Sequence, residues 1–296
     1  MRREDFPLPT LGPRLRKLLS EVLQGRGFVL LRGLPVERWS AVERAAAYFG
    51  IGTHLGNAVR QNAKGHVLGH VRDLGRSGDD PTARIYQTTA RQGYHTDSCD
   101  VVGLFCLARA RSGGESSLIS SMAAFNEMRK RRPDLLACLF DPVETDLRGE
   151  IGPTGKPYFS LPVFSWHAGL LSSVYHRKYI DSARRLPGVP AYTAAQEEAM
   201  DLLDSLLEGE RLRLRMDFQP GDIQLVHNHT VLHDRTAFTD WPEPERKRHL
   251  LRLWLSPAEA RPLPPVFADR YGSLTPGARG GVVLPRVAHI APLEPE

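Results

Sequence analysis

Cysteine is scarce in this chain, which has three cysteines among its 296 residues, at positions 99, 106 and 138. So few cysteines at irregular spacing exclude a disulfide framework, and a reducing compartment, the cytoplasm, is expected. Long apolar runs are lacking too, because no stretch approaches the ~18 consecutive apolar residues that a membrane span needs. The charged N-terminal stretch has no apolar core of the kind found in secretory signals. The sequence therefore predicts a cytoplasmic protein without a membrane partner.

Concentrated charge of one sign is also missing, although the chain has a formal net charge of +5 and an isoelectric point near 9.2. Its 39 basic residues are scattered among 34 acidic ones. The densest basic run, residues 129–133, closes a predicted helix, where cations are favourable. We therefore expect no nucleic-acid partner and a small anionic ligand instead. The sequence leaves open whether the chain forms a homo-oligomer.

What the chain does contain is a succession of short strands, bounded by glycine and proline and interrupted by helices. One helix is predicted to begin near Thr193, because Thr193 and Gln196 form a capping box. Without a repeat or linker, residues 1–296 are expected to form a single domain, mainly β with flanking helices, in a barrel or jelly roll. Residues 257–296, rich in proline and glycine, are expected to be a covering segment. The other helices are predicted over 13–25, 38–49 and about 120–131, and the strands over 27–35, 85–89, 101–108, 116–121, 211–218, 223–228 and 248–256.

A histidine and an aspartate stand two residues apart in the stretch GYHTDSCD. On a strand, residues i and i+2 point to the same side, so His95 and Asp97 could offer a nitrogen and an oxygen to one metal ion. Three more imidazoles, His227, His229 and His233, follow within a short stretch. These three could bind zinc together, or one of them could complete the two-histidine, one-carboxylate triad of non-haem Fe(II) oxygenases. The residues alone leave both alternatives open.

The last predicted strand has two arginines on one face. Arg248 and Arg252 alternate with leucines and share their side of the strand with Trp254. Such a face is either a solvated exterior or the wall of an anion-binding interior. Combined with a metal triad it favours an anion pocket, because a guanidinium binds a carboxylate in a bidentate fork. A metal with open positions beside a deep arginine suits a dicarboxylic 2-oxo acid.

Together these segments resemble the taurine/α-ketoglutarate dioxygenase-like (TauD/TfdA) family of Fe(II)/2-oxoglutarate-dependent oxygenases, over about residues 27–256. YHTD resembles the family's His-x-Asp element, and GDIQLVHNHTVLHDRTAF resembles the strand and loop with its distal histidine. The resemblance implies that His95, Asp97 and His233 bind Fe(II), with O₂ as co-reactant. It also implies a double-stranded β-helix, the cupin-like jelly roll, with helices packed outside.

The same resemblance implies where the cosubstrate binds. SGGESSLIS resembles a family segment whose hydroxyl residue contacts 2-oxoglutarate, and this residue is Ser116 here. KRHLLRLWL resembles the final strand, whose first arginine, Arg248, holds the far carboxylate of 2-oxoglutarate. Arg252 matches a second basic position that faces the active site and, in sulfonate-using members, the substrate's anion. Because family halogenases lack the carboxylate found here at Asp97, hydroxylation, desaturation or cyclisation of a small anionic or amino-acid-like substrate is implied.

Two alternatives to this oxygenase are a non-catalytic, cupin-like protein that binds a metal or small molecule, and a zinc hydrolase that uses His227, His229 and His233. Arg91 stands where taurine-using members have an asparagine, so taurine itself is not the expected substrate. The roles of Arg91, Arg235 and Cys99 are left open, as are those of His227 and His229 outside the zinc hypothesis.

Overall fold

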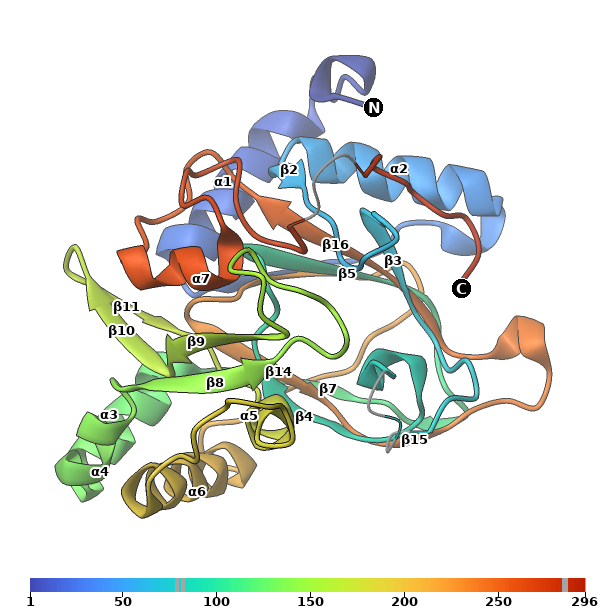
Figure 1. Cartoon of the computed structure of the whole chain (residues 1–296). Helices are drawn as coiled ribbons and strands as arrows, with labels where there is room; N and C mark the ends of the chain where they lie inside the picture. Colours follow the sequence, from blue (N-terminus) through green and yellow to red (C-terminus); the bar gives the residue numbers. More distant parts are fainter. Residues whose placement is uncertain (78–79, 81–82, 284–286, 296) are drawn as a thin grey trace.

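Two antiparallel sheets face each other at the centre of the computed structural model, which describes residues 1–77, 80, 83–283 and 287–295 (Figure 1). The larger sheet has six strands in the order β1-β13-β5-β16-β2, with β3 also paired to β16. The smaller sheet has four, in the order β12-β7-β14-β4. The strands of the larger sheet are β1 (Phe28–Leu31), β13 (Ile223–His227), β5 (Val101–Ala108), β16 (His249–Ser256), β2 (Asn57–Ala58) and β3 (Leu68–Val71). Those of the smaller sheet are β12 (Leu214–Met216), β7 (Ser116–Ser120), β14 (Val231–Arg235) and β4 (Gln92–His95).

Three strand pairs lie outside the two central sheets. They are β8 (Pro142–Asp146) with β9 (Tyr158–Pro162), β10 (Phe164–His167) with β11 (Leu170–Ser173), and β6 (Ser112–Gly113) with β15 (Phe238–Thr239). Residues 152–157, GPTGKP, belong to the connection that joins β8 to β9. This pair brings residues of the β8–β9 connection toward the opening between the central sheets (Figure 1).

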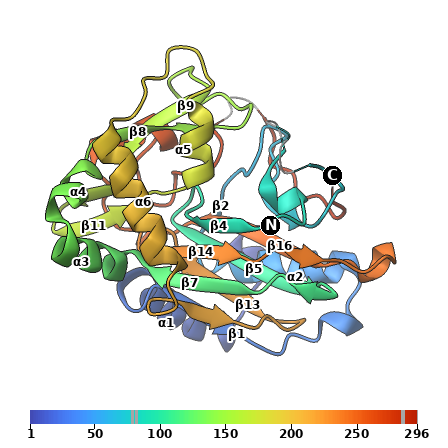
Figure 2. The same ribbon diagram turned by 90° about the horizontal axis from the view of Figure 1, so that it is seen from below.

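Helices cover the outer face of each central sheet. α1 and α2 pack on the larger sheet, whereas α3, α4 and α6 pack on the smaller one, as the view from below shows for α6 beside β7 and β14 (Figure 2). Among the described residues, none of the helices is both long and apolar enough to cross a bilayer. The α-helices are α1 (Leu11–Gln24), α2 (Ala41–Thr53), α3 (Ser121–Arg131), α4 (Pro133–Cys138), α5 (Arg177–Ala183), α6 (Ala194–Glu208) and α7 (Ala268–Tyr271). Short 3₁₀ helices cover Arg3–Asp5, Val36–Arg38, Ile85–Gln87, Pro244–Arg246 and Pro265–Phe267.

β16 shows how this layering hides polar side chains. Its outward leucines, Leu251, Leu253 and Leu255, pack in one hydrophobic cluster under α1 and α2. The alternate residues, among them Arg252 and Trp254, point between the two sheets and are buried as well. Because both faces of the strand are covered, burial alone does not distinguish the face under the helices from the face between the sheets. The two faces differ in charge, since the arginines lie on the face between the sheets.

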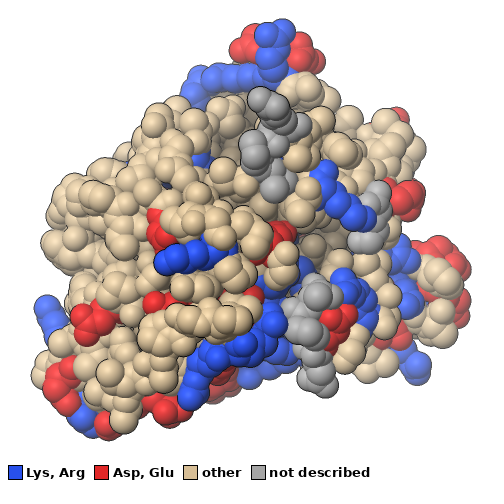
Figure 3. Space-filling view, viewed as in Figure 1, with Lys and Arg blue, Asp and Glu red and all other residues tan. Residues whose placement is uncertain are grey.

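Surface charge is mixed on the face seen in Figure 3, where basic side chains gather below the centre with acidic ones beside them. Arg177, at the start of α5, is an example of such pairing. Its guanidinium lies 2.7 Å from Asp201 and 3.0 Å from both Asp181 and Asp204. Exposed pairs of this kind contribute little to stability, about 0–1 kcal/mol each.

The predicted fold class, a mainly β jelly roll with flanking helices, is confirmed. Most predicted helices and strands are present, and Thr193 and Gln196 form the expected capping box at the start of α6. The strand predicted over 85–89 is wrong, because Ile85–Gln87 is a 3₁₀ turn that is closed by Arg84 and Gln87. β-branched and aromatic residues favoured a strand locally, but no neighbouring strand is available there.

The packing of α2 on the larger sheet predicts one sensitive position. A Cβ at Gly103, in the middle of β5, would lie 2.6 Å from the Tyr48 hydroxyl oxygen and 3.2 Å from Leu225. Because Tyr48 and Leu225 are both buried, we expect Gly103→Ala to lower the free energy of unfolding by about 1–3 kcal/mol. Chemical denaturation measures it. Gly93→Ala is the matched control, since Gly93 also lies in a strand but its Cβ would meet nothing within 4 Å. Equal effects of the two changes would contradict this packing.

Candidate active site

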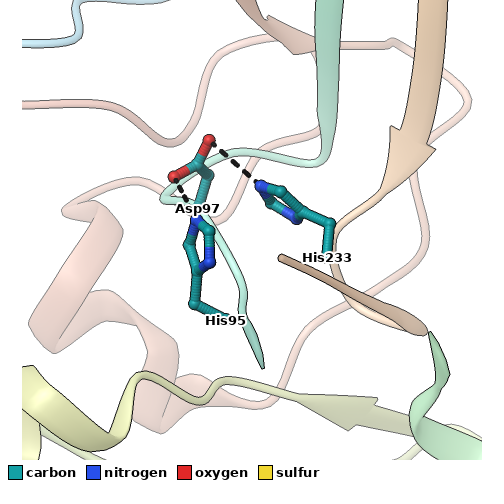
Figure 4. A group of neighbouring side chains, drawn as sticks. All are labelled: His95, Asp97 and His233. Atoms are coloured by element: carbon teal, nitrogen blue, oxygen red, sulfur yellow. Dashed lines mark ion pairs between the residues drawn. The ribbon is translucent and has the colours of Figure 1, made fainter. Parts of the chain in front are cut away.

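Two neighbouring strands of the smaller sheet bring two histidines together. β4 and β14 pair antiparallel with His95 directly opposite His233, and their rings lie 4.2 Å apart between centroids. Asp97 follows β4 and turns back toward both rings (Figure 4). Its Oδ1 is 3.8 Å from His95 Nε2 and its Oδ2 is 4.0 Å from His233 Nε2. One ligand atom from each of the three residues lies within 4.8 Å of the others.

The protonation of these groups suits a divalent cation. Burial lowers the pKa of His95, and burial together with the neighbouring His95 lowers the pKa of His233 to about 3. Burial raises the pKa of Asp97, but Arg252 and the two histidines outweigh it and bring that pKa down to about 2. At neutral pH the site therefore presents two neutral imidazoles and one carboxylate, the forms that coordinate metals.

Contacts behind His95 and Asp97 hold these two residues in place. His95 Nδ1 lies 2.9 Å from the Gly93 carbonyl oxygen, so this nitrogen donates and Nε2 is the acceptor, which lies 2.8 Å from the Gln92 side-chain nitrogen in this structure. The Trp254 indole N–H donates to Asp97 Oδ2 at 2.8 Å, and the Asp97 backbone N–H donates to the Asn228 side chain at 3.1 Å. The donor set, with the supports of His95 and Asp97, fits Fe(II) in a facial triad.

A cavity runs from the triad between the two sheets. Ser116, Arg235 and Arg248 line it, as do Leu104 and Leu250. Nη1 of Arg248, and both Nε and Nη1 of Arg235, are buried without a hydrogen-bond partner. Burial lowers the pKa of Arg248 to about 10, and burial with the neighbouring Arg248 lowers that of Arg235 to about 9. Two buried guanidinium groups with unused donors favour an anion such as a carboxylate.

Arg252 differs from Arg248 in being paired already. Its Nε donates to Gln61 Oε1 at 2.8 Å, and its Nη1 lies 3.5 Å from Asp97 Oδ2. Its guanidinium group also lies 4.7 Å from the ring centroids of Tyr86 and Trp254. The face predicted for both arginines is therefore the inner one, where Arg252 lies next to the triad.

Arg91 does not reach the active site. Its guanidinium lies 2.8 Å from Glu208 and 3.3 Å from Asp234, on the outer side of the smaller sheet. The pairing of β14 with β4 shifts between His233 and Arg235, and this bulge turns Gln92 into the cavity instead. Arg91 therefore lines neither cavity at the triad, and the inference from position 91 that taurine is not the expected substrate stays a prediction.

The zinc hypothesis is also wrong. His229 Nε2 lies 2.9 Å from Asp100, and His227 Nδ1 lies 2.9 Å from the Thr230 hydroxyl. In the part of the chain that the structure describes, His95, Asp97 and His233 form the one group of three or more such side chains whose ligand atoms converge. The His229 ring instead packs against the rings of Phe267 and Tyr271.

Cys99 is fully buried and accepts a hydrogen bond from the Asn228 amide at 2.9 Å. Burial raises the pKa of its thiol well above the ordinary value, so it stays protonated and packs as a small apolar residue.

The sequence left the role of Arg235 open and gave no indication of Arg270. Arg235 lies two positions after His233 on β14, so strand alternation alone could have placed both on the inner face. Arg270, in α7, lines a second cavity beside the triad. No motif marked it, because it lies in the segment that was expected only to cover the fold.

Solved structures that share this fold include iron-dependent oxygenases. Asparagine oxygenase in complex with Fe(II), 2S,3S-3-hydroxyasparagine and succinate matches with a TM-score of 0.65 and 16% identity, over 86% of this chain and 81% of that one. OrfP in complex with Fe and alpha-ketoglutaric acid matches with a TM-score of 0.63 and 14% identity, over 86% of this chain and 83% of that one. With its family match, this chain falls in the class of Fe(II)/2-oxoglutarate-dependent oxygenases.

The family follows from the sequence comparison. Residues 1–254 match the model of the taurine catabolism dioxygenase TauD, TfdA family. FR-33289 synthase of Streptomyces rubellomurinus is 32% identical over 266 residues, which cover 88% of this chain and 78% of that protein. The taurine hydroxylase-like protein SAT17 of Stachybotrys chartarum is 32% identical over 264 residues, which cover 84% of this chain and 66% of that protein. The chain belongs to the TauD/TfdA family. The predicted family, enzyme class and cofactors, Fe(II), 2-oxoglutarate and O₂, are confirmed.

The geometry predicts that the triad has no spare ligand. We expect His233→Ala to weaken Fe(II) or Co(II) binding by more than the roughly 10–100-fold that a merely supporting residue contributes. Anaerobic equilibrium dialysis measures the affinity. His167→Ala, on the outlying strand β10, is the control and should bind metal as the unchanged protein does. Unaltered metal affinity in the His233 variant would transfer the role to another residue.

Proposed function

We propose that His95, Asp97 and His233 hold Fe(II), and that the cavity between the sheets binds 2-oxoglutarate with its far carboxylate on Arg248. One observation carries the proposal: a buried Arg248 with an unpartnered Nη1, at the wall of a cavity that begins at the triad. Ser116 is placed to donate its hydroxyl to the same carboxylate, and Arg235 adds two further unused N–H donors. This arrangement suits a planar dicarboxylate that chelates a metal at its other end.

The protein's own part in the reaction is to orient and to exclude water. With Fe(II) and 2-oxoglutarate bound, the centre supplies an oxidant made from O₂, while 2-oxoglutarate is converted to succinate and CO₂. Trp254 and Asn228 fix the direction of Asp97, and Arg252 keeps that carboxylate ionised. Leu104 and Leu250 give the cosubstrate cavity dry walls. Since Asp97 retains the carboxylate ligand, we assign hydroxylation, desaturation or cyclisation rather than halogenation.

The second cavity adjoins His95 and Asp97 and is the proposed substrate site. Its wall combines tyrosines with the basic residues Arg84, Arg252 and Arg270. We therefore propose a small anionic or amino-acid-like substrate. The names of similar proteins agree with this, since asparagine oxygenase and OrfP were solved with hydroxylated amino acids. Three free cysteines, two of them buried, support the proposal that the enzyme works in the cytoplasm.

A cupin-like binding protein could have the same fold and triad without turnover. Succinate formation separates the two functions. On addition of Fe(II), ascorbate and 2-oxoglutarate in air, we expect succinate to accumulate slowly, and to accumulate faster with small acids or amino acids that fit the second cavity. A metal-loaded chain that binds 2-oxoglutarate yet never forms succinate, with or without such candidates, would be a binding protein.

The assignment of Arg248 predicts a specific kinetic change. Removal of one buried partner of a charged pair costs about 2–5 kcal/mol, or roughly thirtyfold to several thousandfold in affinity. Arg248→Ala should therefore raise the KM for 2-oxoglutarate by at least about thirtyfold. Arg248→Lys should restore only part of the affinity, because an ammonium lacks the fork. Succinate formation at varied 2-oxoglutarate measures it.

Arg215→Ala is the control for this experiment, since Arg215 is exposed and pairs with Glu210 at 2.8 Å, away from the cavity. It should leave the KM for 2-oxoglutarate unchanged. If Arg248→Ala also left it unchanged, the cavity between the sheets would not be the cosubstrate site.

A further inference from the structure

The C-terminal segment forms part of the wall of the substrate cavity. α7 lies beyond residue 254, where the family match ends, and it packs against β9 on the left of Figure 1. Phe267 and Tyr271 anchor it in a hydrophobic cluster with Phe159. In addition, the Ser160 backbone N–H donates to Asp269 at 2.6 Å. Arg270 is thereby held at the cavity by a well-packed element.

Arg270 stands out among the buried arginines. Among the described residues six arginines are buried, namely Arg148, Arg235, Arg248, Arg252, Arg270 and Arg279. Arg279, for example, is paired with Asp100 at 2.6 Å. Of these six, Arg248 and Arg270 are the two whose guanidinium groups have neither a hydrogen bond nor an ion pair. Arg248 lines the cavity assigned to 2-oxoglutarate, and Arg270 lines the other cavity.

The surroundings of Arg270 do not compensate its charge. Its guanidinium lies 4.7 Å from the Phe159 ring centroid, and its side chain is 9% exposed. Burial lowers its pKa. The nearby Glu150 is taken up by Arg84, whose Nη2 lies 2.8 Å away, and Asp97 belongs to the triad. A buried cation left unpaired is costly, which favours an anion from outside the chain.

Other groups in the cavity complete a site for a small molecule. His176 Nε2 is buried without a hydrogen-bond partner, and its ring stacks on Tyr179 at 3.6 Å between centroids. The same ring lies 5.1 Å from that of His95. Both His176 and Tyr179 line the cavity with Arg270. The cavity thus offers a cation, an unused imidazole nitrogen and aromatic walls next to the metal triad.

We propose that Arg270 binds an oxyanion group of the primary substrate, a carboxylate, sulfonate or phosphoryl group, and so positions the substrate beside the triad. The inference rests on the proposed function, because it takes the second cavity to be the substrate site. Arg252, whose guanidinium is already paired with Gln61 and Asp97, has fewer donors left for this role. Specificity for an acidic substrate is then determined partly by a segment outside the family match.

Thermal unfolding of the full chain tests this without turnover. The chain is loaded with Co(II) and 2-oxoglutarate, so that Arg248 is occupied, and then titrated with acetate, methanesulfonate or methylphosphonate. We expect at least one of these anions to raise the Tm of the unchanged protein in a saturable way. The anion that acts at the lowest concentration identifies the chemical class. In Arg270→Met, the apparent affinity for that anion should fall by about thirtyfold or more.

Stability separates a binding role from a structural one. If Arg270 serves a ligand, Arg270→Met in the absence of an anion should be at least as stable as the unchanged protein, because it removes an unpaired buried charge. Arg270→Lys, which keeps the charge, should retain a weakened response to the anion. If none of the three anions stabilises the unchanged protein, or if Arg270→Met responds to them equally, the proposal is wrong.

Arg248→Met is the matched control, since Arg248 is the other buried arginine without a partner. It should lose the stabilisation by 2-oxoglutarate and keep the response to the probe anions. If 2-oxoglutarate never stabilises the Co(II)-loaded protein, the proposed function is wrong. The role of Arg270 is then still tested by comparing how the probe anions change the Tm of metal-free Arg270→Met and metal-free Arg248→Met. If 2-oxoglutarate stabilises and the probe anions do not, only the Arg270 inference fails.

Discussion

The structure depends on charge that is buried between two sheets. Helices cover both outer faces, so the polar side chains of β4, β14 and β16 have the space between the sheets as their common environment. Asp97, Arg248 and Arg252 are all buried there or nearly so. Burial of a charge is costly unless it is paired. The charges of Asp97 and Arg252 compensate one another in part, because the two side chains lie 3.5 Å apart. The Arg248 guanidinium has no hydrogen-bond or ion-pair partner among the described residues. A metal ion and a dicarboxylate together would correct that imbalance of charge.

Many helices and strands can be predicted from the sequence because the pattern of apolar and polar residues agrees with the faces that the fold buries. The alternation in β16 places Arg248 and Arg252 on one face, and the fold makes that face the interior. His95 and Asp97 are found from their spacing. Pairing His95 with His233, rather than with His227 or His229, requires the long-range register of β4 against β14. The spacing of residues in the sequence does not reveal how two distant strands pair. The choice of His233 therefore came from the family resemblance and not from periodicity.

The failures have physical causes as well. A bulge between β4 and β14 turns Gln92 inward and Arg91 outward, and a single irregular pairing is not visible in a pattern of alternation. Arg270 was missed because α7 has four residues and no motif. Its importance appears only when the partners of all buried arginines are compared. Proline- and glycine-rich segments can thus contribute binding residues although their sequence indicates only irregular structure.

The most direct test of the central claim is whether iron and 2-oxoglutarate meet at the same site. Chelation of a 2-oxo acid to Fe(II) produces a charge-transfer absorption in the visible range that neither partner has alone. Under anaerobic conditions, we expect this absorption to appear when 2-oxoglutarate is added to the Fe(II)-loaded chain and to saturate at one equivalent. Saturable binding of both iron and 2-oxoglutarate without that absorption would place them at separate sites and contradict the account.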